Sequence, residues 1–217
     1  ILNYQLSGTP FKILYTSSEP LLTKTVDSET VFIVYGDVFE VGEIGIEVSG
    51  SIEVEFTDGV TVSKIDGGRI VVSYIHDNRD RVAILRSGTN RLYIIVVSRF
   101  RAERTWYIDE VDPPLILISN IYFVGKVSKS GDKVQIDLEL DEASYGSATL
   151  VLFKPLTRIV IGGREYSLKH VYGSIYRTYI DADREGGKTS IAVDRAWRIS
   201  KEPTQQDGDV IDPRKPL

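Results

Sequence analysis

The stretch that decides the fold class is Ser51-Ile52-Glu53-Val54-Glu55-Phe56. Its apolar residues occupy every second position, so an extended chain would place Ile52, Val54 and Phe56 on one face and the two glutamates on the other. This period is typical of a half-buried β-strand. We therefore expect one face of the strand to pack on a core and the other to meet solvent.

A second stretch has a different pattern, Leu92-Tyr93-Ile94-Ile95-Val96-Val97. It is apolar at consecutive positions, so both faces of an extended chain would need cover. We expect this strand to be central in its sheet, with a layer packed on each side, and to be among the most buried segments.

Similar short runs, rich in β-branched and aromatic residues, recur along the whole chain between Gly, Asp, Asn and Ser breakers. This recurrence predicts an all-β protein built from antiparallel strands in sandwiches. The predicted strands are residues 11–16, 30–35, 43–48, 51–56, 69–74, 81–85, 91–97, 115–119, 122–128, 133–140, 148–153, 158–161, 176–180 and 190–193.

Glycine-containing turns separate several of these runs. Thr57-Asp58-Gly59, Asp66-Gly67-Gly68 and Ser87-Gly88-Thr89-Asn90 are predicted hairpin loops. The succession of predicted strands is interrupted at Val111-Asp112-Pro113-Pro114, because proline has no backbone N–H to donate to a neighbouring strand.

These breaks predict two successive antiparallel β-sandwich domains. The first covers residues 1–111 and the smaller second one covers residues 112–200. Residues 201–217 hold three prolines and little apolar periodicity, which predicts a linker or tail.

Composition narrows the classes of function. The 217 residues carry a formal charge of −5 with acids and bases interleaved, which disfavours nucleic acid as a partner. No apolar run is long enough to span a bilayer, so we expect a soluble chain; its compartment, including an extracellular one, stays open. The absence of Cys and Met, with only four Asn and four Gln, hints at a thermophile. Ile1 and the missing Met indicate a mature product or a fragment.

Chemistry-bearing residues are few, and each has a plain structural explanation. His76 and His170 fall in different predicted domains and are expected to be loop or strand-edge residues, so no metal or catalytic site is predicted. The glutamates of the 51–56 stretch, like Asp137 and Glu139, have glycosidase-like spacing but are expected to form solvated strand faces. Two acidic loops are expected to be turns or tail and not calcium sites, Asp181-Ala182-Asp183-Arg184-Glu185 and Asp207-Gly208-Asp209. No cofactor is predicted.

The aromatic residues offer one candidate binding site. Trp106 and Tyr107 lie beside several arginines, and exposed rings of this kind stack on the apolar faces of sugars. A core or interdomain contact is the favoured use of these rings, and carbohydrate binding is the functional role predicted for them if they are exposed.

Several segments, in order, resemble the β-domains that follow the catalytic barrel in the multidomain β-galactosidases of glycoside hydrolase family 35. In the first domain they are Ile13 to Glu19, Val31 to Gly36, Ile46 to Gly50 and Tyr93 to Val97 running into Arg99, Ala102 and Trp106-Tyr107. In the second they are Tyr122 through Leu138, Ile159 to Gly163 and Trp197-Arg198.

This resemblance implies a non-catalytic scaffold region of a retaining β-galactosidase, which packs against a catalytic barrel and neighbouring β-domains of the parent protein. The family's catalytic glutamates lie on that barrel, so none is carried over to this chain, and the fragment alone is expected to be inactive. Galactosides are the implied ligands of the parent.

Two other functions stay open at the level of sequence. One is a free-standing cell-surface or filament subunit that exchanges a strand through Lys201 to Leu217. The other is a carbohydrate-binding module that acts through Trp106 and nearby rings. The sugar, the oligomeric state and the origin of the fragment are not encoded in these patterns.

Overall fold

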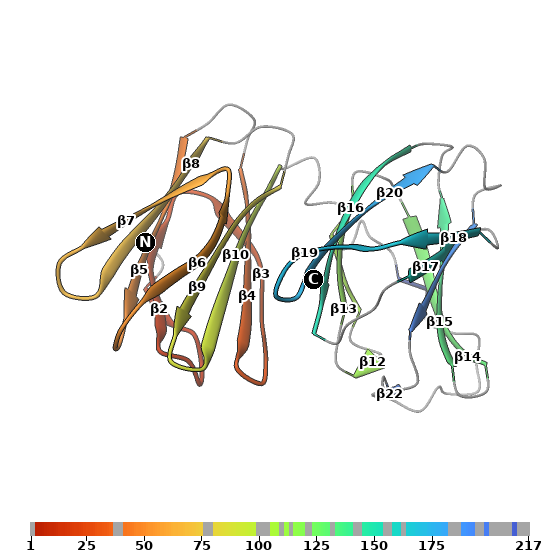
Figure 1. Ribbon diagram of the computed structural model, residues 1–217, viewed down its shortest axis with the longest axis horizontal. Coiled ribbons are helices and arrows are strands. Elements are labelled where there is room, and N and C mark those ends of the chain that lie inside the picture. Colours follow the sequence, from red (N-terminus) through yellow and green to blue (C-terminus); the bar gives the residue numbers. More distant parts are fainter. Residues whose placement is uncertain are drawn as a thin grey trace. The chain divides into compact units, whose positions relative to one another are not determined.

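The computed structural model describes residues 3–36, 41–75, 80–98, 105–108, 111–112, 115–119, 123–130, 133–140, 145–153, 158–161, 164–181, 188–193, 198–199 and 210–211. Within these residues every helix or strand assigned is a β-strand, arranged in layered sheets (Figure 1). The prediction of an all-β sandwich protein is confirmed.

The chain divides into two compact units, Ile1–Ala102 and Glu103–Leu217. The division falls before the double proline at which the sequence predicted it. The reason is strand β11 (Thr105–Ile108), which precedes the prolines but pairs with β13 (Leu115–Ser119) beyond them. Pro113 and Pro114 themselves lie outside the described residues.

The first unit contains two five-stranded sheets. The first sheet has the order β1-β2-β5-β8-β7, and all of its pairs are antiparallel. Its strands are β1 (Tyr4–Gln5), β2 (Phe11–Thr16), β5 (Val41–Val48), β8 (Arg69–Ile75) and β7 (Val60–Ile65).

The second sheet has the order β3-β4-β10-β9-β6. Its strands are β3 (Glu19–Val26), β4 (Glu29–Gly36), β10 (Asn90–Ser98), β9 (Arg81–Ser87) and β6 (Glu53–Asp58). The central pair, β4 with β10, is parallel, whereas the sequence predicted antiparallel pairing throughout. Parallel neighbours must be joined by a crossover, and here strands β5 to β9 lie between them in the chain.

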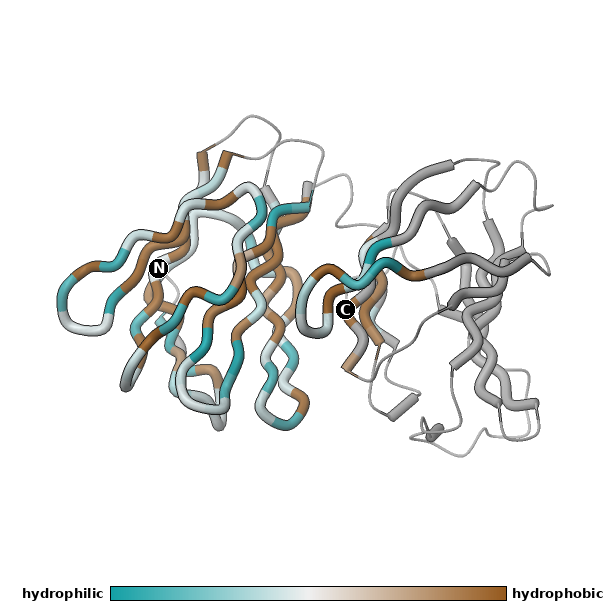
Figure 2. The backbone as a smooth tube through the Cα atoms, viewed as in Figure 1, coloured by the Kyte–Doolittle hydropathy of each residue, from teal (hydrophilic) through white to brown (hydrophobic). Residues whose placement is uncertain are grey.

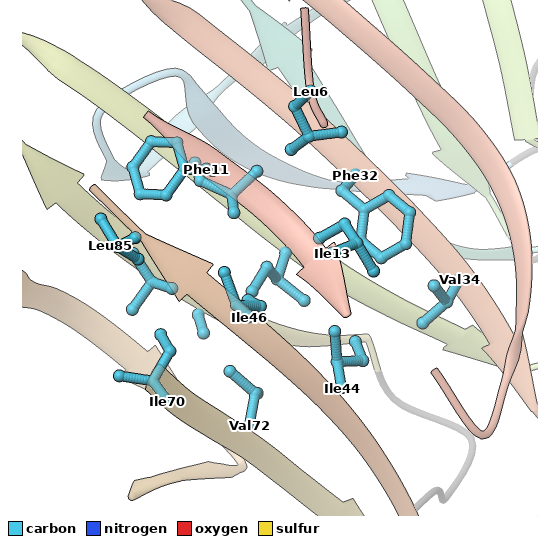
Figure 3. Close-up of a cluster of buried hydrophobic side chains, with 14 of the residues drawn as sticks. Leu6, Phe11, Ile13, Phe32, Val34, Ile44, Ile46, Ile70, Val72 and Leu85 are labelled. Carbon is cyan, nitrogen blue, oxygen red and sulfur yellow. The ribbon is translucent and has the colours of Figure 1, made fainter. Parts of the chain in front are cut away.

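Apolar residues gather between these two sheets and form one core. Figure 2 shows hydrophobic positions running along β4, β9 and β10, and Figure 3 shows side chains of both sheets pointing toward one another. The core consists of Leu6, Phe11, Ile13, Phe32, Val34, Ile44, Ile46, Val48, Ile70, Val72, Tyr74, Ala83, Leu85, Leu92, Ile94 and Val96.

The predicted glycine turns have two different outcomes. Gly67 and Gly68 (φ 79° and 76°) join β7 to its partner β8, and Gly88 (φ 61°) joins β9 to β10, so two of the three hairpins are confirmed. Gly59 (φ 70°) instead links β6 of the second sheet to β7 of the first. The predicted hairpin there is wrong, because the positive φ serves a corner between layers.

The second unit contains a five-stranded sheet, β11-β13-β16-β20-β19, a six-stranded sheet, β18-β17-β21-β15-β14-β23, and the short pair β12-β22. The remaining bounds are β12 (Val111–Asp112), β14 (Phe123–Ser130), β15 (Lys133–Leu140), β16 (Tyr145–Leu152), β17 (Arg158–Ile161), β18 (Arg164–Ser167), β19 (Lys169–Tyr172), β20 (Ile175–Asp181), β21 (Lys188–Val193), β22 (Arg198–Ile199) and β23 (Val210–Ile211).

The predicted tail contributes one of these strands. Val210 and Ile211 pair with Lys126 and Gly125 of β14 and form the edge of the six-stranded sheet. The segment predicted as a linker or tail, residues 201–217, therefore includes two residues that pair in a sheet. Backbone pairing with β14 supplies hydrogen bonds that local sequence periodicity does not reveal.

Candidate interaction face

The second sheet of the first unit is apolar on the side that faces away from the core as well. Leu92, Ile94 and Val96 of β10 belong to the core, so the alternate residues of that strand belong to the opposite side, which we call the outer face. The apolar residues at outer-face positions that are 0% exposed are Val31, Ile33, Val82, Ile84, Tyr93, Ile95 and Val97. The prediction that residues 92–97 are covered on both sides is confirmed.

Strand register arranges the outer face in rows that run across the sheet. Tyr93 lies opposite Val31 of β4 and Ile84 of β9, and Ile84 in turn lies opposite Phe56 of β6. The next row is formed by Ile33, Ile95 and Val82. Cross-strand neighbours of this kind are the contacts that stabilise a sheet, so these rows form one continuous apolar surface.

A row of charged residues borders the apolar rows. Arg91 of β10 lies opposite Glu29 of β4 and Arg86 of β9, and Arg86 lies opposite Glu53 of β6. Two arginines directly opposite each other would repel. The row therefore needs a further acid, and Glu55 supplies it.

Glu55 lies at an irregularity of β6, since the register with β9 shifts between Val54 and Phe56. A bulge of this kind changes the direction of the side chains on a strand. The Glu55 side chain is 4% exposed and accepts hydrogen bonds from Arg91 Nε at 2.7 Å and from Arg86 Nη1 at 3.3 Å. We call Glu29, Glu53, Glu55, Arg86 and Arg91 the charged belt.

The rest of the charged belt is held by longer contacts. Arg91 Nη1 is 3.7 Å from Glu29 Oε1, and Arg86 Nη2 is 3.4 Å from Glu53 Oε2. The Tyr93 hydroxyl donates to Glu29 at 2.6 Å and so connects the belt to the apolar rows. Hydrogen bonding to Glu55 raises the pKa of the Arg91 guanidinium above its ordinary value, which keeps its charge fixed.

The bulge changes two expectations drawn from residues 51–56. Val54 packs against the core as predicted, but Phe56 lies opposite Ile84 on the outer face. The predicted common face of Ile52, Val54 and Phe56 is therefore wrong for Phe56. Glu53 is solvated as predicted, with a side chain that is 62% exposed, whereas the almost fully covered Glu55 is not.

The first sheet of the same unit presents a different outer side. Lys12, Glu47 and Arg69 form a row across β2, β5 and β8, with contacts of 3.7 Å and 3.6 Å to the Glu47 carboxylate. Their side chains are 35%, 36% and 58% exposed. This side of the sandwich therefore faces water.

The predicted carbohydrate site falls on an edge strand of the second unit. Trp106 lies opposite Leu117 and Tyr107 lies opposite Ile116, both in the pair β11 with β13. Adjacent positions of a strand belong to opposite faces of its sheet, so positions 106 and 107 do not share one face. A carbohydrate-binding role for these two residues stays a prediction.

The two histidines and the acidic loops add no joint site. His170 lies on the edge strand β19, where Nε2 is 2.8 Å from the Gly173 carbonyl and the ring lies 5.1 Å from that of Tyr176. Its predicted strand-edge position is confirmed. His76, residues 182–185 and residues 207–209 lie outside the described residues. In the described ranges no three His, Asp or Glu side chains gather into a metal site. The same ranges contain no helical segment that could span a bilayer.

Sequence reasoning missed the charged belt, although a signal for it was present. Arg86 and Arg91 flank the turn at residues 87–90, so a hairpin with that turn places two like charges opposite each other. Such a pair calls for an acid from a third position. Its identification as Glu55 depended on the bulge, which the alternating pattern concealed.

A comparison with models of known protein families finds no match to this chain, and a search among curated proteins finds none.

Proposed function

We propose that this chain is a non-catalytic β-sandwich scaffold region of a β-galactosidase-like glycoside hydrolase, which packs against a catalytic barrel outside these 217 residues. The ordered likeness of its strands to the β-domains of family 35 suggests the class of parent protein. The outer face of the second sheet carries the structural part of the proposal.

An isolated β-sandwich needs only one buried apolar layer, the core between its two sheets. The first unit has a second buried apolar layer, because Val31, Ile84, Tyr93 and Ile95 are all 0% exposed on the side of the second sheet that faces away from that core. These side chains are covered within the 217 residues themselves, so the second sheet is an inner layer of this chain. A sheet packed on both sides is a rigid element, as a scaffold region needs.

The direct test is peptide mapping of the protein isolated from its natural source, combined with hydrolysis of an aryl β-galactoside. We expect peptides from an upstream barrel in the same polypeptide, and hydrolysis with retention at the anomeric carbon. Deleting the residues that correspond to 1–217 should reduce the stability of the parent while its catalytic glutamates remain intact. A natural polypeptide without a glycosidase region would overturn the proposal.

A further inference from the structure

The described strands of the first unit include four edge strands, and three of them have features that discourage pairing with another chain. Strand β1 is only two residues long. Strand β3 contains Pro20 and a register shift directly after it, and β6 carries Glu53, Glu55 and a bulge. Short length, proline, charge and bulges are the usual protections of a sheet edge.

Strand β7 has almost none of these protections. Residues Val60 to Ile65 pair with β8 in an unbroken register, and among the described strands β8 is the only neighbour of β7 in its sheet. The strand has no proline and one charged residue, Lys64. A regular, β-branched edge of this length is a template for another strand.

Strand β7 is anchored to the rest of the first unit by its core-side residues. Val60 and Val62 pack against the core cluster, and the Lys64 ammonium donates to the Ile52 carbonyl at 3.3 Å. Thr61 and Ser63, which alternate with these residues, are exposed, and Ile65 is 53% exposed. The strand is thus preformed for pairing and accessible.

We propose that β7 pairs with β7 of a second copy of this chain, antiparallel and centred on Val62. In that register Val62 lies opposite Val62, Thr61 lies opposite Ser63, and Val60 lies opposite Lys64. Core-side residues meet core-side residues, as the strand period requires. No two like charges are opposed, because Lys64 of each copy faces a valine.

Self-pairing fits β7 better than pairing with a heterologous strand. The register closes by a two-fold axis, so the same surface is used on both copies and growth stops at a dimer. Two Thr–Ser pairs offer hydroxyl contacts on the exposed side, and Val62 on the axis continues the apolar side. The five-stranded sheets of the two copies become one. This inference does not rest on the proposed function.

The test is sedimentation velocity of the 217-residue chain over a series of rising concentrations. The contact is short, so we expect a weak, concentration-dependent dimer. In the variant Thr61→Lys/Ser63→Lys both cross-strand pairs oppose like charges, and in Thr61→Glu/Ser63→Glu they do the same with the opposite sign. For each variant alone, the dissociation constant of the dimer should rise at least about tenfold.

An equimolar mixture of these two variants should dimerise again, because every opposed pair is then Lys with Glu. The matched control is Ser7→Lys/Thr89→Lys, which adds the same charge at exposed turn positions and should leave dimerisation unchanged. Urea unfolding checks that each variant is folded. A chain that stays monomeric at every concentration, or a dimer that ignores the charge pairs, overturns the proposal.

Discussion

The two sheets of the first unit share one core but differ in what their other sides present. On the first sheet a charged row of Lys12, Glu47 and Arg69 is one-third to more than one-half exposed. On the second sheet the charged row surrounds a Glu55 side chain that is 4% exposed, and the rows beside it are apolar and covered. Both sheets therefore carry a row of opposed acidic and basic side chains, but the row on the first sheet is exposed to water and the row on the second sheet surrounds a covered carboxylate.

This difference shows where the energy of the ion pairs is concentrated. Exposed pairs contribute little because water and salt screen them, whereas a carboxylate removed from water must be matched by its partners. Glu55 is matched by two arginines, one at 2.7 Å and one at 3.3 Å. We expect equivalent substitutions in the two sheets to differ accordingly.

The largest expected effect comes from a charge on the covered face. Ile95→Lys places an ammonium group among residues that are 0% exposed, and we expect it to lower the free energy of unfolding by at least about 3 kcal/mol. Urea unfolding measures this, with hydrogen exchange of peptides from residues 80–98 to locate the effect in the first unit.

The matched control is Ser73→Lys, which adds the same side chain to the first sheet opposite Glu43. This change should stay within about 0.5 kcal/mol, as is usual on a solvated surface. Equal costs for the two lysines would show that the sides of the sandwich do not differ.

The middle effect tests the two charged rows against each other. Glu55→Gln leaves Arg86 and Arg91 directly opposite each other without the carboxylate between them, and should cost about 1–3 kcal/mol. Glu47→Gln removes the corresponding acid of the exposed row and should cost less than about 0.5 kcal/mol.

The salt dependence of the stability loss should also differ between Glu55→Gln and Glu47→Gln. In about 1 M salt the small effect of Glu47→Gln should vanish, because the Debye length is then about 3 Å. The effect of Glu55→Gln should largely persist, since its carboxylate is covered. Unfolding midpoints at low and high salt provide the comparison, and two equal salt responses would refute the distinction.

The sequence predicted the central strands well because their apolar pattern is unambiguous. Residues 11–16, 115–119, 133–140 and 158–161 are strands with the predicted bounds. Strand β3 was missed, since it contains Pro20 and ends at a turn where Asp27, not glycine, has a positive φ of 53°. Strand β7 was missed because serine and lysine interrupt its apolar residues. Edge strands are more exposed than central strands and so contain fewer apolar residues. The alternation of apolar and polar residues therefore detects them poorly.

The outer face could be predicted in part and the charged belt could not. A doubly apolar stretch at residues 92–97 requires cover on both sides, and the structure shows it. Glu55, however, alternates with apolar residues like any solvated glutamate. Only the register with β9 reveals the bulge that brings it to Arg86 and Arg91. Long-range register is not contained in a local pattern.

The smallest effect concerns the two tyrosines that lie on these opposite sides of the sandwich. Tyr93 is 0% exposed, and its hydroxyl donates to Glu29 at 2.6 Å, so Tyr93→Phe leaves a carboxylate one hydrogen bond short and should cost about 1.5 kcal/mol. Tyr15 lies over Gly45 on the first sheet and contributes mainly its ring, which Tyr15→Phe retains. That change should cost less than about 0.5 kcal/mol. Urea unfolding of both variants measures the two losses in the free energy of unfolding. A neutral Tyr93→Phe would mean that water replaces the lost donor and that this end of the outer face is open to solvent.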